Sequence, residues 1–191
     1  MNLIALILTG GKSTRMGTDK GLLPYQGTSL VQHAFGNLTS LRIEVFVSIN
    51  ESQQETYTKL FQSNQLIVDH PVSAGPLRGL LSAHVTFPEM DIFVLATDLP
   101  DMQPSTLEKL LQVYKAETPS YDFFAYRNEE YWEPLCGIYT SKGLKKIQNE
   151  LAEGKLQSYS FQQLLSRFKT KALEITISEK SSFRNFNSQG E

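Results

Sequence analysis

A short basic segment near the start of the chain has the residue types of a phosphate-binding loop. It reads LTGGKSTRMGTDKGLL over residues 8–23 and follows directly on the apolar run LIALI. Gly10 and Gly11 can adopt backbone angles closed to other residues and expose their amide groups. Arg15 and Lys20 bring positive charge to the same place. Together these groups suit a polyphosphate, although a solvated glycine turn would have a similar composition.

The spacing of this segment excludes two familiar phosphate-binding motifs. A P-loop needs a glycine five positions before the glycine that precedes its lysine, but Gly11 precedes Lys12 and position 6 is Leu6. The dinucleotide pattern Gly-x-Gly-x-x-Gly cannot be drawn from Gly10, Gly11 and Gly17 either. What remains is a glycine-rich loop at the carboxyl end of the first strand, the edge at which open α/β sheets bind ligands.

A second candidate site is an aspartate that ends a buried strand. In VLATDLPDM, Asp98 follows an apolar run and Asp101 lies three residues further on. A carboxylate at the carboxyl edge of a strand is well placed to hold Mg²⁺, which takes few protein ligands and completes its shell with water and phosphate oxygens. The alternative is a turn or a cap for the next helix, and Asp101 fits that role better than Asp98.

Apolar runs of strand length alternate with helical spacings along the chain. The strands are expected at residues 2–8, 43–49, 65–69, 91–98, 121–127, 132–140 and 171–177. The helices are expected at residues 28–41, 52–62, 75–87, 104–117, 141–154 and 158–168. This order predicts one α/β domain over residues 1–191, a three-layer α/β/α Rossmann-like fold with a mostly parallel sheet and mixed strand direction after residue 120.

The composition excludes several classes of protein. The chain has 191 residues, of which 40% are hydrophobic and 20% are charged, enough for a sizeable core. A net charge of -2 and a pI near 6.0 provide no general attraction to nucleic acid or to anionic membranes. No apolar stretch approaches the roughly 20 residues of a membrane helix, and no signal peptide is recognisable, so we expect a cytoplasmic protein. One cysteine and three scattered histidines exclude an internal disulfide and show no zinc spacing.

The glycine-rich segment resembles the Leu-Ala-Gly-Gly-x-x-x-Arg-Met-Gly-x-Asp-Lys signature of molybdenum cofactor guanylyltransferases, within the wider family of nucleotidyltransferases. The segments VDHPVSAGPLRGL, LATDLP, EPLCGIY and FRNFN also match this family. The resemblance implies that the protein transfers GMP from GTP to the terminal phosphate of molybdopterin and releases pyrophosphate. It also implies Mg²⁺ as the cofactor.

The resemblance assigns roles to individual positions. Lys20, Arg15 and Asp98 would be the catalytic residues. The nucleotide would lie against residues at four strand ends and their loops, namely Leu8, Thr9, Gly10, Gly11, Lys20, Ser48, Asn50, Asp69 and Asp98. Asn187, with Asn185 as the alternative, would join Asp98 at the metal. Two positions depart from the family pattern, because Thr9 replaces an alanine and Ser48 replaces an asparagine that Asn50 would substitute from the same face.

Three residues in the segment WEPLC, over residues 132–136, could have either a functional or a structural role. Trp132 and Glu133 either face the pterin of the acceptor, by stacking and by hydrogen bonding to its amide edge, or pack at the start of a strand. Cys136 lies in an apolar context with no nearby histidine, and we expect a small core residue rather than a nucleophile.

Rival functions remain open within and beyond the enzyme class. A cytidylyltransferase acting on molybdopterin or on a sugar or polyol phosphate is one alternative, but relatives that use CTP typically carry an alanine where Gly10 leaves room for a purine. A non-catalytic carrier of molybdopterin or nucleotide is another, although it would not need Asp98 together with Arg15 and Lys20. The resemblance further implies transient contacts with molybdenum-insertion proteins and molybdoenzyme chaperones, and we expect a monomer.

Overall fold

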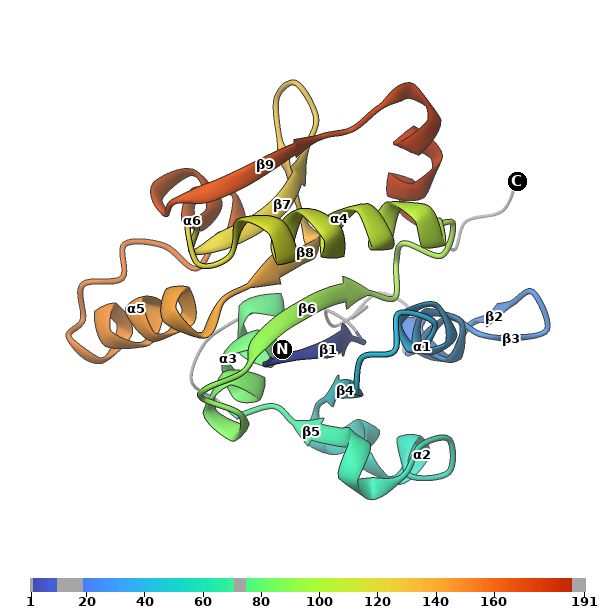
Figure 1. The fold of residues 1–191 in the computed structure, drawn as a ribbon. Helices are drawn as coiled ribbons and strands as arrows, with labels where there is room; N and C mark the ends of the chain where they lie inside the picture. The colour runs from blue at the N-terminus through green and yellow to red at the C-terminus, as the bar shows by residue number, and fades with distance from the viewer. Residues whose placement is uncertain (1, 10–18, 71–74, 187–191) are drawn as a thin grey trace.

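The computed structural model describes residues 2–9, 19–70 and 75–186 and is shown in Figure 1. A seven-stranded sheet runs through the molecule in the order β5-β4-β1-β6-β8-β7-β9. Its strands are β1 (Leu3–Leu8), β4 (Val45–Ile49), β5 (Leu66–Val68), β6 (Asp91–Ala96), β7 (Phe123–Arg127), β8 (Trp132–Tyr139) and β9 (Thr170–Glu174). β1 pairs parallel with β4 and β6, whereas β8 is antiparallel to both of its neighbours. The prediction of a mostly parallel sheet is confirmed.

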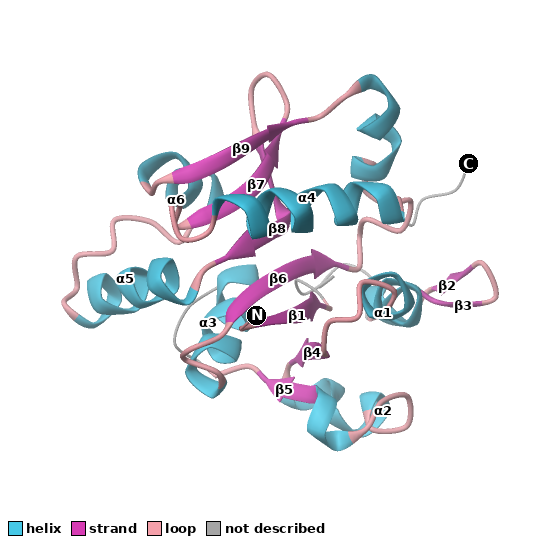
Figure 2. Ribbon diagram, in the orientation of Figure 1, coloured by secondary structure: helices cyan, strands magenta, loops and turns pink. Residues whose placement is uncertain are grey.

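Helices cover both faces of the sheet (Figure 2). One face carries α1 (Leu30–Thr39), α2 (Gln54–Tyr57), α4 (Pro104–Glu117) and the 3-10 helix η4 (Ile177–Phe183). The other carries α3 (Pro76–Thr86), α5 (Ser141–Ala152) and α6 (Phe161–Arg167). Side chains of β1 alternate between the two layers, with Ile7 in the first core and Leu6 in the second. The three-layer α/β/α prediction is therefore confirmed.

The helix starts follow from local chemistry. Ser29 caps α1 in a reciprocal capping box with Gln32, and the Thr140 hydroxyl accepts from the Gly143 amide at the start of α5. Pro76 and Pro104 occupy the first turns of α3 and α4, where the missing amide hydrogen costs nothing. These starts fix where α1, α3, α4 and α5 leave the sheet edges.

Two predicted elements differ from those observed, and one observed element was not predicted. The helix expected at 52–62 is only a 3-10 turn, η2 (Glu51–Gln53), followed by the short α2, because Tyr57 is its one buried residue and no apolar stripe continues. The strand expected to reach residue 177 ends at Glu174, opposite the last residue of its partner β7. A small hairpin of β2 (Pro24–Tyr25) and β3 (Thr28–Ser29) was not predicted.

Within the described ranges, no helix has both the length and the apolar character needed to cross a membrane.

Candidate active site

The carboxyl ends of β1, β4, β5 and β6 meet at one edge of the sheet (Figure 1). Leu8 lies opposite Ser48 on one side and Ala96 on the other. Asp69 follows β5 and Asp98 follows β6 at the same edge. The sheet therefore brings together four of the positions that the sequence singled out. Gly10, Gly11, Arg15 and Asn187 lie outside the described residues.

Ser48 and Asp69 form a hydrogen-bonded pair at the ends of β4 and β5. The Ser48 hydroxyl donates to Asp69 Oδ1 at 2.6 Å, and the Asp69 amide donates to Ile49 O at 2.8 Å. Burial raises the pKa of the Asp69 carboxyl, and the Ser48 hydrogen bond opposes that rise. Asn50 is exposed and accepts from the Ser52 hydroxyl, so its side chain is not part of this pair.

The close approach of α3 to this pair depends on a glycine. A Cβ on Gly79 would lie 2.3 Å from Ser48 Oγ and 2.8 Å from Leu8 Cδ2. Gly79→Ala should therefore destabilise the fold by about 1–3 kcal/mol through overpacking and displace Ser48. Urea unfolding measures the loss of stability.

The matched control is Gly36→Ala in α1, because a Cβ on Gly36 meets nothing within 4 Å. That variant should be stabilised by about 0.5–1 kcal/mol, since alanine loses less backbone entropy in a helix than glycine. Equal stability of the two variants would contradict a steric role for Gly79.

Thr9, which replaces the alanine of the family pattern, leaves no unsatisfied polar group in the core. The buried Thr9 hydroxyl donates to Ser48 O at 2.6 Å, so its polar atom is satisfied inside the protein. The bond also ties the end of β1 to the end of β4.

Lys20 begins a 3-10 helix, η1 (Lys20–Leu22), close to the end of β1. Asp19 caps this turn, because its carboxylate accepts from the Gly21 amide. Gln53 and Tyr57 also donate to Asp19. The sequence analysis gave no role to Asp19, although it is the aspartate of the family signature, nor to Gln53 and Tyr57, because no local pattern joins residues 34 and 38 positions apart.

Asp98 has an unsatisfied carboxylate oxygen. Its Oδ1 is buried and makes no hydrogen bond within the described part of the chain. Its carbonyl accepts from the Phe186 amide at 2.9 Å, so the C-terminal segment returns to this strand end. Asp101 does not cap the next helix, as Gln103 occupies that position, and it accepts from the Tyr25 hydroxyl at 2.7 Å instead.

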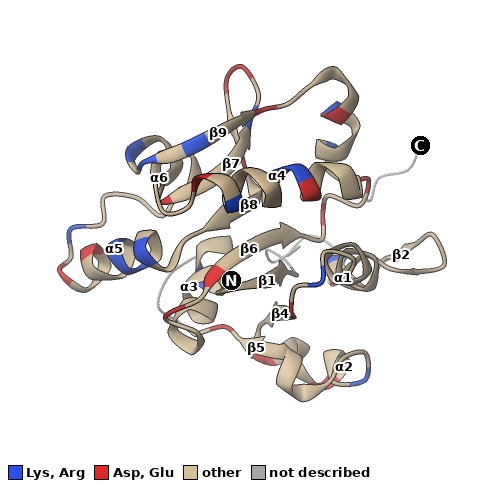
Figure 3. Ribbon diagram, viewed as in Figure 1, with Lys and Arg blue, Asp and Glu red and all other residues tan. Residues whose placement is uncertain are grey.

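Beyond Asp98, the same edge continues into a pocket of about 600 Å³. It is lined by residues of the β7–β8 loop, β8, β9 and η4: Asn128, Glu129, Glu130, Tyr131, Glu133, Glu174, Ile175, Lys180 and Phe183. Figure 3 shows acidic residues on the loop that joins β7 and β8. Burial, followed by repulsion from Asp98, raises the pKa of Glu133. Glu133 therefore lies close enough to Asp98 for the two carboxylates to repel each other.

Trp132 and Cys136 belong to the interior rather than to the site. The Trp132 indole N–H donates to Ser166 Oγ at 3.0 Å, and its ring packs in the core on the α6 side. Cys136 is fully buried, and burial raises the pKa of its thiol, so it stays a neutral thiol. The core readings of both residues hold.

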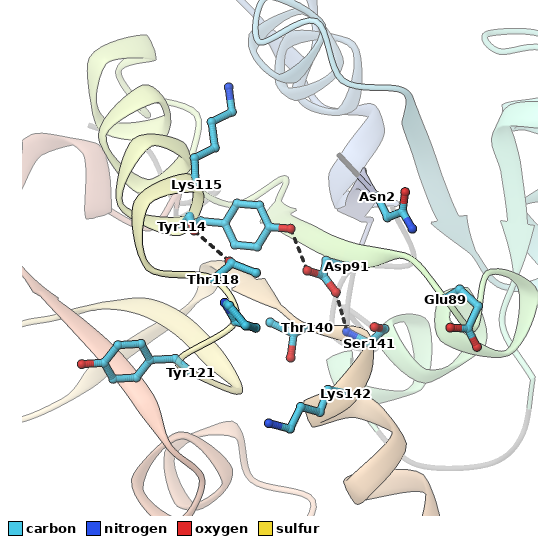
Figure 4. A pocket seen from close by; sticks show the side chains of 11 residues that line it. Asn2, Glu89, Asp91, Tyr114, Lys115, Thr118, Tyr121, Thr140, Ser141 and Lys142 are labelled. Atoms are coloured by element: carbon cyan, nitrogen blue, oxygen red, sulfur yellow. Dashed lines mark hydrogen bonds between the residues drawn. The ribbon is translucent and has the colours of Figure 1, made fainter.

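A larger pocket, of about 660 Å³, lies at the opposite edge of the sheet (Figure 4). At its centre, Asp91 accepts from the Tyr114 hydroxyl at 2.6 Å and from the Ser141 amide at 2.7 Å. Both carboxylate oxygens are thus used to join β6 with α4 and α5. This pocket is remote from the predicted site residues, and its carboxylate has a structural role.

The fold is that of an open α/β sheet with polar and acidic side chains gathered where its parallel strands end, the place at which such sheets bind ligands. The chain belongs to the family defined by the MobA-like NTP transferase domain, whose model matches residues 5–168. The family resemblance of the sequence is thereby confirmed.

Named relatives agree with this family. The molybdenum cofactor guanylyltransferase of Pseudomonas putida is 30% identical over 151 residues, which are 78% of this chain and 76% of that protein. The molybdenum cofactor biosynthesis bifunctional protein of Synechocystis is 35% identical over 152 residues, or 77% of this chain, and the match spans only 42% of that longer protein. A solved structure, molybdopterin-guanine dinucleotide biosynthesis protein A from Archaeoglobus fulgidus, shares the fold with a TM-score of 0.77 at 21% identity, covering 97% of this chain and 92% of its own.

Proposed function

We propose that the protein transfers GMP from GTP to the terminal phosphate of molybdopterin and releases pyrophosphate. The observation that carries this proposal is the gathering of Lys20, Asp69 and Asp98 at one sheet edge, in a chain whose relatives include named molybdenum cofactor guanylyltransferases. Nucleotidyl transfer needs no protein nucleophile, because an oxygen of the acceptor phosphate attacks the α-phosphorus as pyrophosphate leaves. The protein's part is to position the two substrates and to neutralise charge.

The residues at the ends of β1 and β5 are proposed to bind the nucleotide and its phosphates. In this proposal Lys20 contacts the α-phosphate and the acceptor, and Asp69 contacts the nucleoside. Arg15 and the amides of Gly10 and Gly11 bind the leaving pyrophosphate; these residues lie outside the described part of the chain. Lysine and backbone amides suit this task, since both donate hydrogen bonds to anionic oxygens.

Asp98 is the residue that would hold Mg²⁺. Its buried Oδ1 lacks a partner among the described residues, and a carboxylate oxygen is a preferred ligand of this ion. Within the described residues no three acidic, histidine or cysteine side chains form a metal cluster, which fits an ion held by few protein ligands. When bound, the ion supplies positive charge to the phosphate oxygens. Asn187 is the proposed second ligand, with Asn185 as the alternative.

The pocket beyond Asp98 is the proposed acceptor subsite. Glu129, Glu130, Glu133 and Glu174 line it, so a phosphate is disfavoured inside and the phosphate arm must point back towards Lys20. The pterin ring of molybdopterin presents ring N–H and amino donors, which a carboxylate such as Glu133 accepts. The exposed ring of Tyr131 provides a surface for stacking.

GTP binding should weaken as the pH falls through the raised pKa of Asp69. Only the ionised Asp69 carboxylate accepts hydrogen bonds from nucleotide donors with both oxygens, and its pKa is raised by burial. Protonation therefore begins at a higher pH than for an ordinary carboxyl of about 3.9. Nucleotide titration over a pH series measures the effect, and Asp69→Asn should bind weakly at every pH with the slope removed. An unchanged slope in Asp69→Asn would assign the pH dependence to another group.

The experiment that tests the function is pyrophosphate release with molybdopterin and Mg²⁺, comparing GTP with CTP and ATP. Release confined to GTP supports guanylyl transfer. Release with CTP alone would make the protein a cytidylyltransferase, and GTP binding without release would favour a carrier. The same proposal includes a cytoplasmic location and a monomeric state. It also includes transient contacts with molybdenum-insertion proteins and molybdoenzyme chaperones.

A further inference from the structure

The Asp19 carboxylate is held by three donors, one from its own turn and two from the segment 53–57. Its Oδ1 accepts from the Gly21 amide at 2.9 Å and from the Tyr57 hydroxyl at 3.2 Å. Its Oδ2 accepts from Gln53 Nε2 at 2.6 Å. A charged acceptor with several directed donors has one preferred orientation, because each lost bond leaves a donor unsatisfied.

Gln53 connects Asp19 to the end of β4. Its Nε2 donates to Asp19, while its Oε1 accepts from the Asn50 amide at 2.8 Å. Both ends of the side-chain amide are therefore committed, which defines its orientation. Gln53 thus joins the segment that carries Lys20 to the strand that carries Ser48.

Tyr57 closes the network from the core. Its side chain is fully buried, and burial together with the Asp19 carboxylate raises its pKa, so the hydroxyl remains a donor. The chain passes so close to it that a Cβ on Gly21 would lie 2.5 Å from the Tyr57 hydroxyl. The residues before and after Lys20 are therefore both fixed, Asp19 by its hydrogen bonds and Gly21 by its bond to Asp19 and its close contact with Tyr57.

We propose that Asp19, Gln53 and Tyr57 are positioning residues that fix Lys20 for contact with the reacting phosphate. The inference rests on the proposed function, which assigns Lys20 to the phosphates. A lysine side chain is long and flexible, so its effect on a transition state depends on where its backbone is held. A misplacement of about 1 Å can cost about 10²-fold in rate without any loss of the charged group.

A swap of the Asp19–Gln53 pair tests this proposal. Asp19→Asn sets two amide groups against each other, and Gln53→Glu sets two carboxylates 2.6 Å apart. The double variant Asp19→Asn/Gln53→Glu restores one donor and one acceptor with nearly the same shape. We expect each single variant to lower kcat at least about tenfold with a smaller change in the KM for GTP, and the double variant to recover most of the loss.

Two further variants complete the series. Tyr57→Phe keeps the ring in the core and removes only the hydroxyl, so it reports on positioning even where another variant folds poorly, and it should lower kcat several-fold. Gln54→Ala is the matched control, because Gln54 is exposed beside Gln53 and should leave kcat unchanged. Single variants with wild-type kcat, or a double variant no faster than the slower single, would overturn the proposal.

Hydrogen exchange separates this inference from the proposed function. In the protein without nucleotide, the Gly21 amide should exchange faster in both single variants and return to the wild-type rate in the double variant. An exchange rate that the single variants leave unchanged would overturn the proposal whatever the activity. Absence of GMP transfer by the wild-type protein, with the expected exchange pattern, would instead overturn the proposed function and leave the network intact.

Discussion

Replacing Lys20 by alanine should lower the rate of GMP transfer by about 10²- to 10³-fold while the protein stays folded. The proposed contact stabilises charge that develops at the α-phosphate, and loss of one preorganised contact of this kind commonly has this effect. Lys20 is only partly buried in a short turn, so removing its side chain leaves the core intact. Steady-state kinetics with GTP and molybdopterin measures the loss, and thermal unfolding checks the fold.

Two companion variants sharpen the Lys20 result. Lys115→Ala removes an exposed lysine from α4 and should retain wild-type kinetics. Lys20→Arg keeps the charge but changes its shape, and it should recover only part of the rate because a guanidinium is not an equivalent point charge. Transfer by Lys20→Ala at the wild-type rate would remove Lys20 from the site.

Asp98→Asn should abolish most transfer without destabilising the protein. The variant removes the charge that would hold Mg²⁺, and a rate loss of about 10²- to 10³-fold is expected. Its buried Oδ1 has no partner within the described residues, and Glu133 lies close enough for repulsion. Removing the charge therefore removes the repulsion between the Asp98 and Glu133 carboxylates in the folded protein.

The distinguishing result for Asp98 is the combination of two measurements. Urea unfolding should give Asp98→Asn a stability equal to or above that of the wild-type protein, while its activity is nearly lost. Glu108→Gln, on an exposed position of α4, should change neither. A variant that loses stability in parallel with activity would make Asp98 a structural residue.

The layers of this protein and the order of its elements along the chain are predictable because they follow from local periodicity. The run 3–8 is apolar throughout since both faces of β1 are covered, and the amphipathic spacing of 104–117 appears as α4 with the same bounds. The carboxyl-edge rule then places Ser48, Asp69 and Asp98 near one another. These steps need only the order of the elements.

The contacts that orient the site could not be predicted in the same way. Asp19 meets Gln53 and Tyr57 across 34 and 38 residues, and Tyr25 meets Asp101 across 76. Such bonds depend on how loops leave the sheet, which periodicity does not encode. Asp101 illustrates the limit: it lies in a turn, one of the two roles that its position indicated, but its bond to the distant Tyr25 could not be predicted.

The most direct test of the central claim is the fate of the α-phosphate of GTP. Purified protein is incubated with Mg²⁺, molybdopterin and GTP labelled at the α-phosphate, and the products are separated. We predict that the label appears in a molecule containing both pterin and guanine, with one pyrophosphate released for each. Label that stays in GTP, or that is released as free GMP with the acceptor unchanged, would contradict guanylyl transfer to molybdopterin.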